Sequence, residues 1–226
     1  DGGLPTSASM SNPHSLAGDS VGNLFFSETS ARVRKVTFLT NIISTYAGNG
    51  ISSYGDNADA TLGSISSPRG LFLDTNYNLY IGCADYRIRK VSAAGALTTF
   101  AGTGTSPWEG IFSNGDGGPA TAARIGAVPG LWVNAITGTA YFSDATLHTI
   151  RAVNILTGSL MATVAGGGVP GHAGDGGLAT DAYMKNPVGI VANSDVSVMY
   201  TSEESFIRRL TLDPLPTATP TALPSP

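Results

Sequence analysis

The sequence has little of three things: cysteine, histidine and charge. It contains one cysteine, Cys83, and three histidines. A single cysteine excludes an internal disulfide, and its apolar surroundings predict a small buried side chain. Charged residues make up 12% of the chain, about half the usual fraction, and the net charge is −4. Because there is no basic cluster, the sequence argues against nucleic acid as the main partner.

Long apolar runs are also missing. No stretch of 18 apolar residues occurs, so we expect no membrane span in this segment. There is no secretory signal, and the first residue is Asp1, so we expect the sequence to be part of a longer protein. Glycine is abundant, with 29 residues, and 42% of the chain is hydrophobic. This mixture favours short strands joined by tight turns over long solvated helices.

One phrase occurs four times along the chain. It consists of an apolar strand, a short turn and a second strand that carries arginine. The copies are found at 23–28 with 32–36, 78–83 with 87–91, 139–144 with 149–153, and 197–202 with 206–210. Self-similarity at a fixed period is typical of repeat architectures, so the sequence predicts an array of similar units.

Two markers set the boundaries of the units. An Asp-Gly-Gly turn, or a variant of it, begins each one, at Asp1, Asp56, Asp116 and Asp175, and each turn is followed by a marker proline. The predicted repeats cover about 1–55, 56–115, 116–174 and 175–212. Residues 213–226 are rich in Pro and Thr and are predicted to form a linker or stalk in extended polyproline form.

Within the second repeat, strands are expected at 70–74, 79–83, 87–91 and 97–101, separated by short turns. This order predicts a four-stranded antiparallel meander, and radial repetition of such meanders makes a β-propeller. We therefore predict an all-β propeller of about four blades. The last repeat shows only three strands, at 190–194, 197–202 and 206–212. Either the N-terminal side supplies the fourth and closes the ring, or the blades belong to a larger propeller, for example a six-bladed one.

Four phrases together resemble the NHL-repeat propeller family, over about residues 1–212: Asp-Gly-Gly-Pro-Ala-Thr at 116–121, Asn-Leu-Tyr-Ile at 78–81, Arg-Ile-Arg-Lys-Val at 87–91 and Thr-Thr-Phe-Ala-Gly-Thr-Gly at 98–104. Members of that family include extracellular sensor domains, protein- or RNA-binding propellers and a peptide-amidating lyase. The resemblance implies an acid after the second strand that pairs with the first arginine of the third. Glu28 and Asp144 fit that acid, whereas Thr149 and Phe206 replace the arginine.

The second arginine of each third strand occupies one repeat position, at Arg34, Arg89, Arg151 and Arg208. A ring of arginines would suit an anion. A residue that recurs with every unit is better explained as a tie between its blade and a neighbouring acid or carbonyl. Asp116 and Asp175 are interpreted as turn residues, because one carboxylate per turn is a poor cage for calcium. We assign all six as structural repeat positions.

Candidate binding residues lie at the mouth of the channel that first strands line. The residues after the marker prolines are His14, Arg69, Gly130 and Val188. The lyase relatives hold zinc with several histidines at such positions, but here one of four is histidine, so we predict neither a metal nor a catalytic set. His14 and Arg69 are expected to contact a ligand or to be solvated rim residues.

One crossing loop, 103–114, is longer than the others. It carries Trp108 and Phe112, which are predicted either to anchor a partner or to fold back on the blade rim.

Together these features favour a non-enzymatic module that binds a protein, or a small-molecule or carbohydrate ligand, on one propeller face without a cofactor. Two alternatives stay open: a metal-dependent lyase or lactone hydrolase that uses the channel, and a structural spacer. The Pro/Thr tail resembles a stalk between extracellular domains, so we expect a secreted or cell-surface protein.

Overall fold

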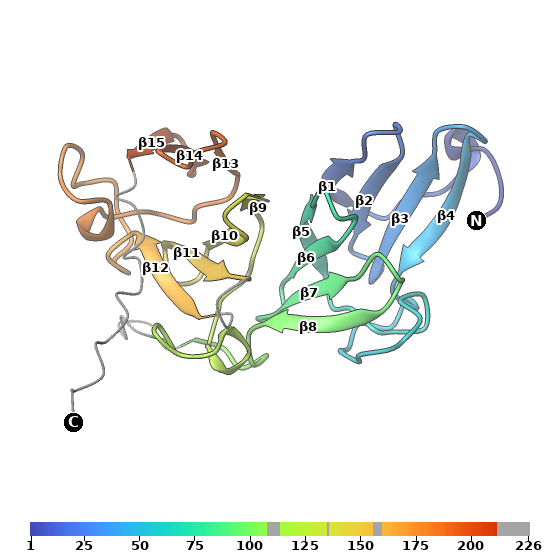
Figure 1. Ribbon diagram of the computed structural model, residues 1–226, viewed down its shortest axis with the longest axis horizontal. Helices are drawn as coiled ribbons and strands as arrows, with labels where there is room; N and C mark the ends of the chain where they lie inside the picture. Colours follow the sequence, from blue (N-terminus) through green and yellow to red (C-terminus); the bar gives the residue numbers. More distant parts are fainter. Residues whose placement is uncertain (108–113, 135, 156–159, 212–226) are drawn as a thin grey trace, which may run out of the picture.

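In the computed structural model the chain forms four antiparallel sheets, here called blades 1 to 4 (Figure 1). The structure describes residues 1–107, 114–134, 136–155 and 160–211. Blade 1 contains β1 (Pro13–Gly18), β2 (Leu24–Glu28), β3 (Arg32–Thr37) and β4 (Ile42–Ala47). Blade 2 contains β5 (Pro68–Leu73), β6 (Leu79–Cys83), β7 (Ile88–Val91) and β8 (Leu97–Ala101). Blade 3 contains β9 (Leu131–Asn134), β10 (Thr139–Asp144), β11 (Thr149–Asn154) and β12 (Met161–Ala165). Blade 4 contains β13 (Ile190–Ala192), β14 (Val198–Ser202) and β15 (Ile207–Thr211).

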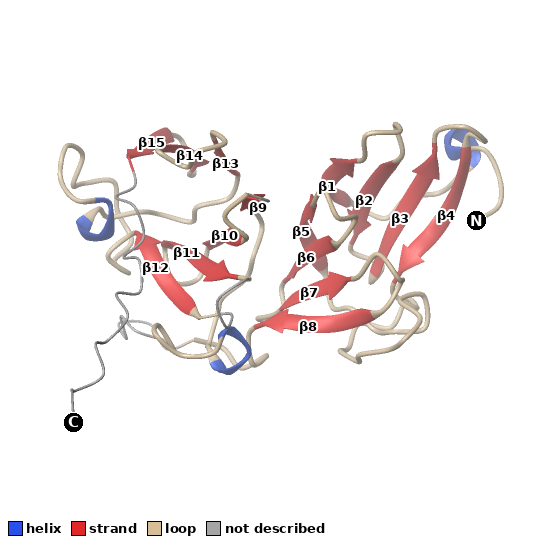
Figure 2. Ribbon diagram, in the orientation of Figure 1, coloured by secondary structure: helices blue, strands red, loops and turns tan. Residues whose placement is uncertain are grey.

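Each blade is a meander in which consecutive strands pair, and the four blades follow one another along an arc (Figure 1). The first strands contact each other from blade to blade, β1 with β5, β5 with β9 and β9 with β13. The prediction of an all-β fold made of antiparallel propeller blades is confirmed. Outside the sheets, the described residues contain three short 3₁₀ helices in the crossing loops, η1 (Pro5–Ser7), η2 (Ala120–Ala122) and η3 (Ala179–Asp181) (Figure 2). None of these described helices is long enough to cross a membrane.

The cores lie between blades and not within them. At one ladder position the aromatic side chains of Phe25, Tyr80 and Tyr141 are buried against the next blade. Tyr200 occupies the same position in blade 4 and is 45% exposed. At the other end of the arc Leu16, on the free face of blade 1, is 63% exposed. Apolar residues that neighbouring blades would cover are therefore open at both ends.

The Gly-x-Gly loops after the fourth strands are structural. Gly48, Gly102 and Gly166 have left-handed backbones, with φ between 85° and 91°. A Cβ at Gly102 would lie 2.3 Å from the carbonyl oxygen of Tyr86 and under 3 Å from the side chain of Ile125. Only glycine allows the loop after the fourth strand to pass this close to the turn before the third strand of the same blade.

Candidate functional site

The residues predicted for the channel mouth lie at the beginnings of the first strands. In β1 and β5 the pairing with the second strand is irregular just after the marker proline, between Pro13 and Leu16 and between Pro68 and Leu71. Bulges of this kind redirect side chains and are frequent next to functional sites. They contain His14, which is exposed, and Arg69, which is half-buried. We call these two residues and their strand starts the axial rim.

A serine hydroxyl holds the two halves of the axial rim together. Ser27 Oγ, at the end of β2, donates to the carbonyl oxygen of Arg69 at 2.6 Å and accepts from the backbone N–H of Ser15 at 3.1 Å. The hydroxyl of Ser15 in turn accepts from the N–H of Leu71 at 3.1 Å. The structure therefore brings the backbones of His14 and Arg69 to the same end of neighbouring blades, and their place at a channel mouth stays a prediction.

An equivalent serine joins blades 3 and 4, and we call this hydrogen bond from a serine hydroxyl to the neighbouring blade the latch. Ser143 Oγ donates to the carbonyl oxygen of Val188 at 2.8 Å and accepts from the N–H of Gly130 at 2.9 Å. A Cβ at Gly130 would lie 2.0 Å from that carbonyl oxygen, so no larger residue fits there. In blade 2 the latch position is Gly82, where a Cβ would lie 2.3 Å from the carbonyl oxygen of Val128. Of the four residues after the marker prolines, Gly130 therefore contributes no side chain, whereas Val188 of blade 4 is 47% exposed.

Because this latch is buried, we expect Ser143→Ala to lower the free energy of unfolding by about 2 kcal/mol, since it strands one N–H and one carbonyl. The matched control is Ser202→Ala. Ser202 Oγ accepts from Gly189 at 2.8 Å in an exposed position, so we expect about 0.5 kcal/mol there. Urea denaturation followed by circular dichroism measures both. Equal losses would show that the latch does not join the blades.

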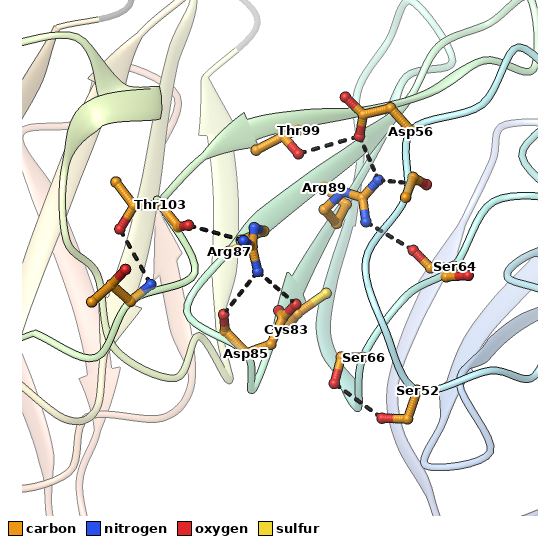
Figure 3. A network of polar contacts seen from close by, with 12 residues as sticks. Ser52, Asp56, Ser64, Ser66, Cys83, Asp85, Arg87, Arg89, Thr99 and Thr103 are labelled. Atoms are coloured by element: carbon orange, nitrogen blue, oxygen red, sulfur yellow. Dashed lines mark hydrogen bonds and ion pairs between the residues drawn. The ribbon is translucent and has the colours of Figure 1, made fainter.

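The four repeat arginines each pair with the aspartate that begins their own repeat. Arg34 Nη2 lies 2.6 Å from Asp1, Arg89 Nη2 lies 2.6 Å from Asp56, Arg151 Nη2 lies 2.5 Å from Asp116, and Arg208 pairs with Asp175. Figure 3 shows Arg89, which also donates to the carbonyl oxygens of Ser64 at 2.8 Å and Gly55 at 3.1 Å. These side chains fasten the crossing loop to the blade, and they do not form a ring around the axis.

The resemblance implied that the acid after the second strand pairs with the first arginine of the third strand. In the structure it lies near the second arginine instead. Glu28 lies 3.5 Å from the second arginine of its blade, Arg34, and Asp144 lies 3.9 Å from Arg151. The first arginine, Arg32, donates instead to the carbonyls of Ser30 and Asn49, both at 3.4 Å. The reason is burial, because the buried guanidinium has the greater need of a counter-charge.

In blade 4 the acid is Glu203, which follows Ser202 directly, as Glu28 follows Ser27 and Asp144 follows Ser143. Glu203 Oε1 lies 3.6 Å from Arg208 Nη1, and Glu203 Oε2 lies 3.3 Å from His172 Nδ1. The His172 ring also contacts the Phe206 ring, with centroids 4.7 Å apart. This histidine cluster was missed in the sequence, because the phrase assigned to blade 4 ended at residue 202 and left out Glu203.

Two acids, one buried and one half-buried, have altered pKa values. Burial raises the pKa of Asp144, although its oxygens accept from the N–H groups of Gly126 and Leu147, both at 2.9 Å. Burial also raises the pKa of Asp85, and Arg87, 3.1 Å away, opposes that effect. Both carboxylates stabilise turns between strands. Neither has a hydrogen bond to His14 or Arg69.

The buried and half-buried acids described above, Asp144, Asp85 and Glu203, are held by backbone N–H groups or by arginine. Burial raises the pKa of the Cys83 thiol, which keeps it protonated and unreactive. His148 Nδ1 accepts from the N–H of Asn186 at 3.3 Å. Among the described residues no group of three or more His, Cys, Asp or Glu is placed to hold a metal ion. Trp108 and Phe112 lie outside the described residues, so their role stays a prediction.

Comparison with known proteins shows fold similarity. The chain matches no protein-family model and no curated protein. An auxiliary nutrient binding protein from Bacteroides ovatus aligns with 92% of the chain and 50% of its own length, at 16% identity and a TM-score of 0.66. A chain in a nidogen/laminin complex aligns with 90% of this chain and 60% of its own length, at 14% identity and a TM-score of 0.60. A streptogramin B lyase aligns with 94% of the chain and 57% of its own length, at 15% identity and a TM-score of 0.56.

Blade geometry and these similarities define a β-propeller. The chain spans half to three fifths of the length of the structures compared. At identities of 14 to 16% the likeness concerns the fold, which hosts binding proteins and enzymes alike.

Proposed function

We propose that this propeller is a binding module that takes its ligand at the axial rim, without bond chemistry. The observation that supports it is the free guanidinium of Arg69. Its Nε is buried without a hydrogen-bond partner, as in three of the repeat arginines, but its side chain alone of these has no ion pair among the described residues. The four repeat arginines, by contrast, are all engaged with an aspartate. An unengaged arginine on the strand that neighbours the one carrying an exposed histidine suits a ligand with an acidic group.

The preferred ligand is a small molecule or carbohydrate that carries a carboxylate. A guanidinium binds a carboxylate through two parallel hydrogen bonds, and His14 can donate to a neighbouring hydroxyl. An acidic side chain of a protein partner would be recognised by the same chemistry. Catalysis is disfavoured because the hydroxyls and acids closest to the rim, Ser27 and Glu28, are bound to backbone or arginine.

We also propose that the chain is an NHL-type propeller and part of a larger ring. The repeated Asp-Gly-Gly turn and Arg-x-Arg strand support the family, and the exposed faces at Leu16 and Tyr200 support further blades. A secreted or cell-surface location is proposed on the composition of residues 213–226 alone.

The test is a binding screen with uronic acids and dicarboxylates, followed by titration calorimetry. We expect Arg69→Ala to weaken binding of any hit by about tenfold or more, because a charge-assisted pair is lost. Arg209→Ala, an exposed arginine on β15, is the matched control and should leave binding unchanged.

Two outcomes would contradict the proposal. One is a hit bound equally well by Arg69→Ala and His14→Ala. The other is an equimolar metal ion in the purified protein that is lost in His14→Ala, which would favour the metal-dependent enzyme.

A further inference from the structure

An aspartate that is followed by glycine can rearrange without an enzyme, because glycine has no side chain to shield its backbone nitrogen. That nitrogen attacks the side-chain carboxyl carbon of the aspartate and loses its proton, while the carboxyl hydroxyl leaves as water. The succinimide ring that forms takes up water at one of its two carbonyls, which restores aspartate or gives isoaspartate. The sequence contains the Asp-Gly pair three times, at 1–2, 116–117 and 175–176.

The second Asp-Gly pair is held at both of its reacting groups. The N–H of Gly117 donates to the carbonyl of Met161 at 2.8 Å, so the nitrogen is engaged with the fourth strand of its blade. The N–H of Thr163 on the same strand donates to Asp116 Oδ2 at 2.8 Å. Only 24% of the Asp116 side chain is exposed. Two hydrogen bonds must therefore break before the ring can close.

The first Asp-Gly pair is held in the same way. The N–H of Gly2 donates to the carbonyl of Ile43 at 2.8 Å, and Thr45 Oγ1 donates to Asp1 Oδ2 at 2.7 Å. In blades 1 and 3 the fourth strand therefore occupies both the nitrogen that would attack and the oxygen that would leave.

The third Asp-Gly pair is free at the same two atoms. Arg208 pairs with Asp175 Oδ1, but neither Asp175 Oδ2 nor the N–H of Gly176 has a hydrogen-bond partner among the described residues. The Asp175 side chain is 81% exposed. Gly176 has a φ of 83°, and Gly2 and Gly117 have φ values of 85° and 80°. Because all three pairs also share the arginine, they differ in what holds the reacting atoms and not in backbone shape.

We infer that Asp175 is a site of spontaneous covalent modification, at which the chain forms a succinimide with Gly176 and then isoaspartate. In the product the main chain runs through the side-chain carboxyl carbon and is one carbon longer, so the carboxylate loses its place opposite Arg208. We expect modified molecules to stay folded, because Glu203 remains 3.6 Å from that arginine. The free α-carboxylate of isoaspartate is the group that isoaspartyl O-methyltransferases methylate, so an enzyme of this class is the expected partner.

The test is to incubate the 226-residue protein for weeks in buffer made with oxygen-18 water and then to map the label by mass spectrometry. Each passage through the succinimide adds one heavy oxygen, and the tryptic peptides 91–124 and 152–185 carry Asp116 and Asp175 separately. We expect the label to accumulate at Asp175 about tenfold or more faster than at Asp116, because two hydrogen bonds must break first at Asp116. An isoaspartyl O-methyltransferase should then transfer methyl groups to the peptide 152–185.

The matched variants are Gly176→Ala and Gly117→Ala. Both glycines have left-handed backbones, and a Cβ at either position would have no atom within 4 Å, so the two changes should cost the fold the same. Gly176→Ala should slow labelling at Asp175, because its methyl group shields the attacking nitrogen, whereas Gly117→Ala should leave that labelling unchanged.

Three results would overturn the inference. They are equal labelling of Asp116 and Asp175 in the parent protein, no label at Asp175, and labelling of Asp175 that Gly176→Ala does not slow. None of these measurements uses a ligand of the axial rim, so their outcome is independent of the proposed function.

Discussion

Gly102→Ala is expected to lower the free energy of unfolding by about 4 kcal/mol. Adopting a left-handed backbone costs a residue with a Cβ about 1 to 2 kcal/mol, and forcing atoms into a filled space adds about 1 to 3 kcal/mol. Gly102 incurs both costs, because its φ is 88° and its Cβ would lie 2.3 Å from the carbonyl oxygen of Tyr86.

Gly95→Ala is the matched control for this prediction. Gly95 has a φ of 86°, but a Cβ there would have no atom within 4 Å. We expect a loss of about 1 kcal/mol, which is the backbone cost alone. Urea denaturation of both variants measures the difference. If the two lose the same stability, the close approach of loop and blade is not needed for the fold, and the Gly-x-Gly pattern has another cause.

The second large effect concerns the arginine that is most deeply buried. Asp56→Ala should lower the free energy of unfolding by about 3 kcal/mol, because it leaves the charge of Arg89 without an ion-pair partner in a site that is fully buried. This value is at the low end of the range for buried pairs, since the Asp56 side chain is half exposed. Arg89 retains two carbonyl acceptors, which orient it without neutralising its charge.

Asp175→Ala provides the comparison. Arg208 has a second acid, Glu203, at 3.6 Å, and Asp175 is largely exposed, so we expect a loss of about 1 kcal/mol or less. Thermal and urea denaturation at pH 7 measure both variants. Equal losses would show that the second acid does not compensate, and that the arginine ties contribute equally in every blade.

The repeat could be predicted because each strand carries its own signal. The fourth strand 97–101 was expected from an apolar run between glycines, and the structure places β8 at the same residues. The third strand was expected from Arg87 and begins one residue later, because Arg87 is drawn into the turn by Asp85 and by the carbonyl of Thr103 at 2.9 Å. Local pattern decides strand identity, and side-chain pairing adjusts the ends.

The partners of individual side chains could not be predicted in the same way. Glu28 is nearer to Arg32 in sequence and stands opposite it across the strands, yet its ion pair is with the more buried Arg34. Likewise, the latch of Ser27 to the Arg69 carbonyl joins residues from different repeats, and no local pattern reports it. For the axial rim, the sequence pattern singled out His14 and Arg69. It could not show that Arg69 lacks an ion pair among the described residues, because that depends on which acids the other arginines bind.

The central claim is that the ligand binds at the axial rim. Chemical-shift mapping by NMR, with isotope-labelled protein and the best carboxylate from the binding screen, tests it most directly. The account predicts that the largest shifts occur at the amides of His14, Ser15 and Arg69 and at the guanidinium of Arg69, with little change in blade 4. Shifts centred instead on β15 or on loop 103–107, with the rim unchanged, would contradict it.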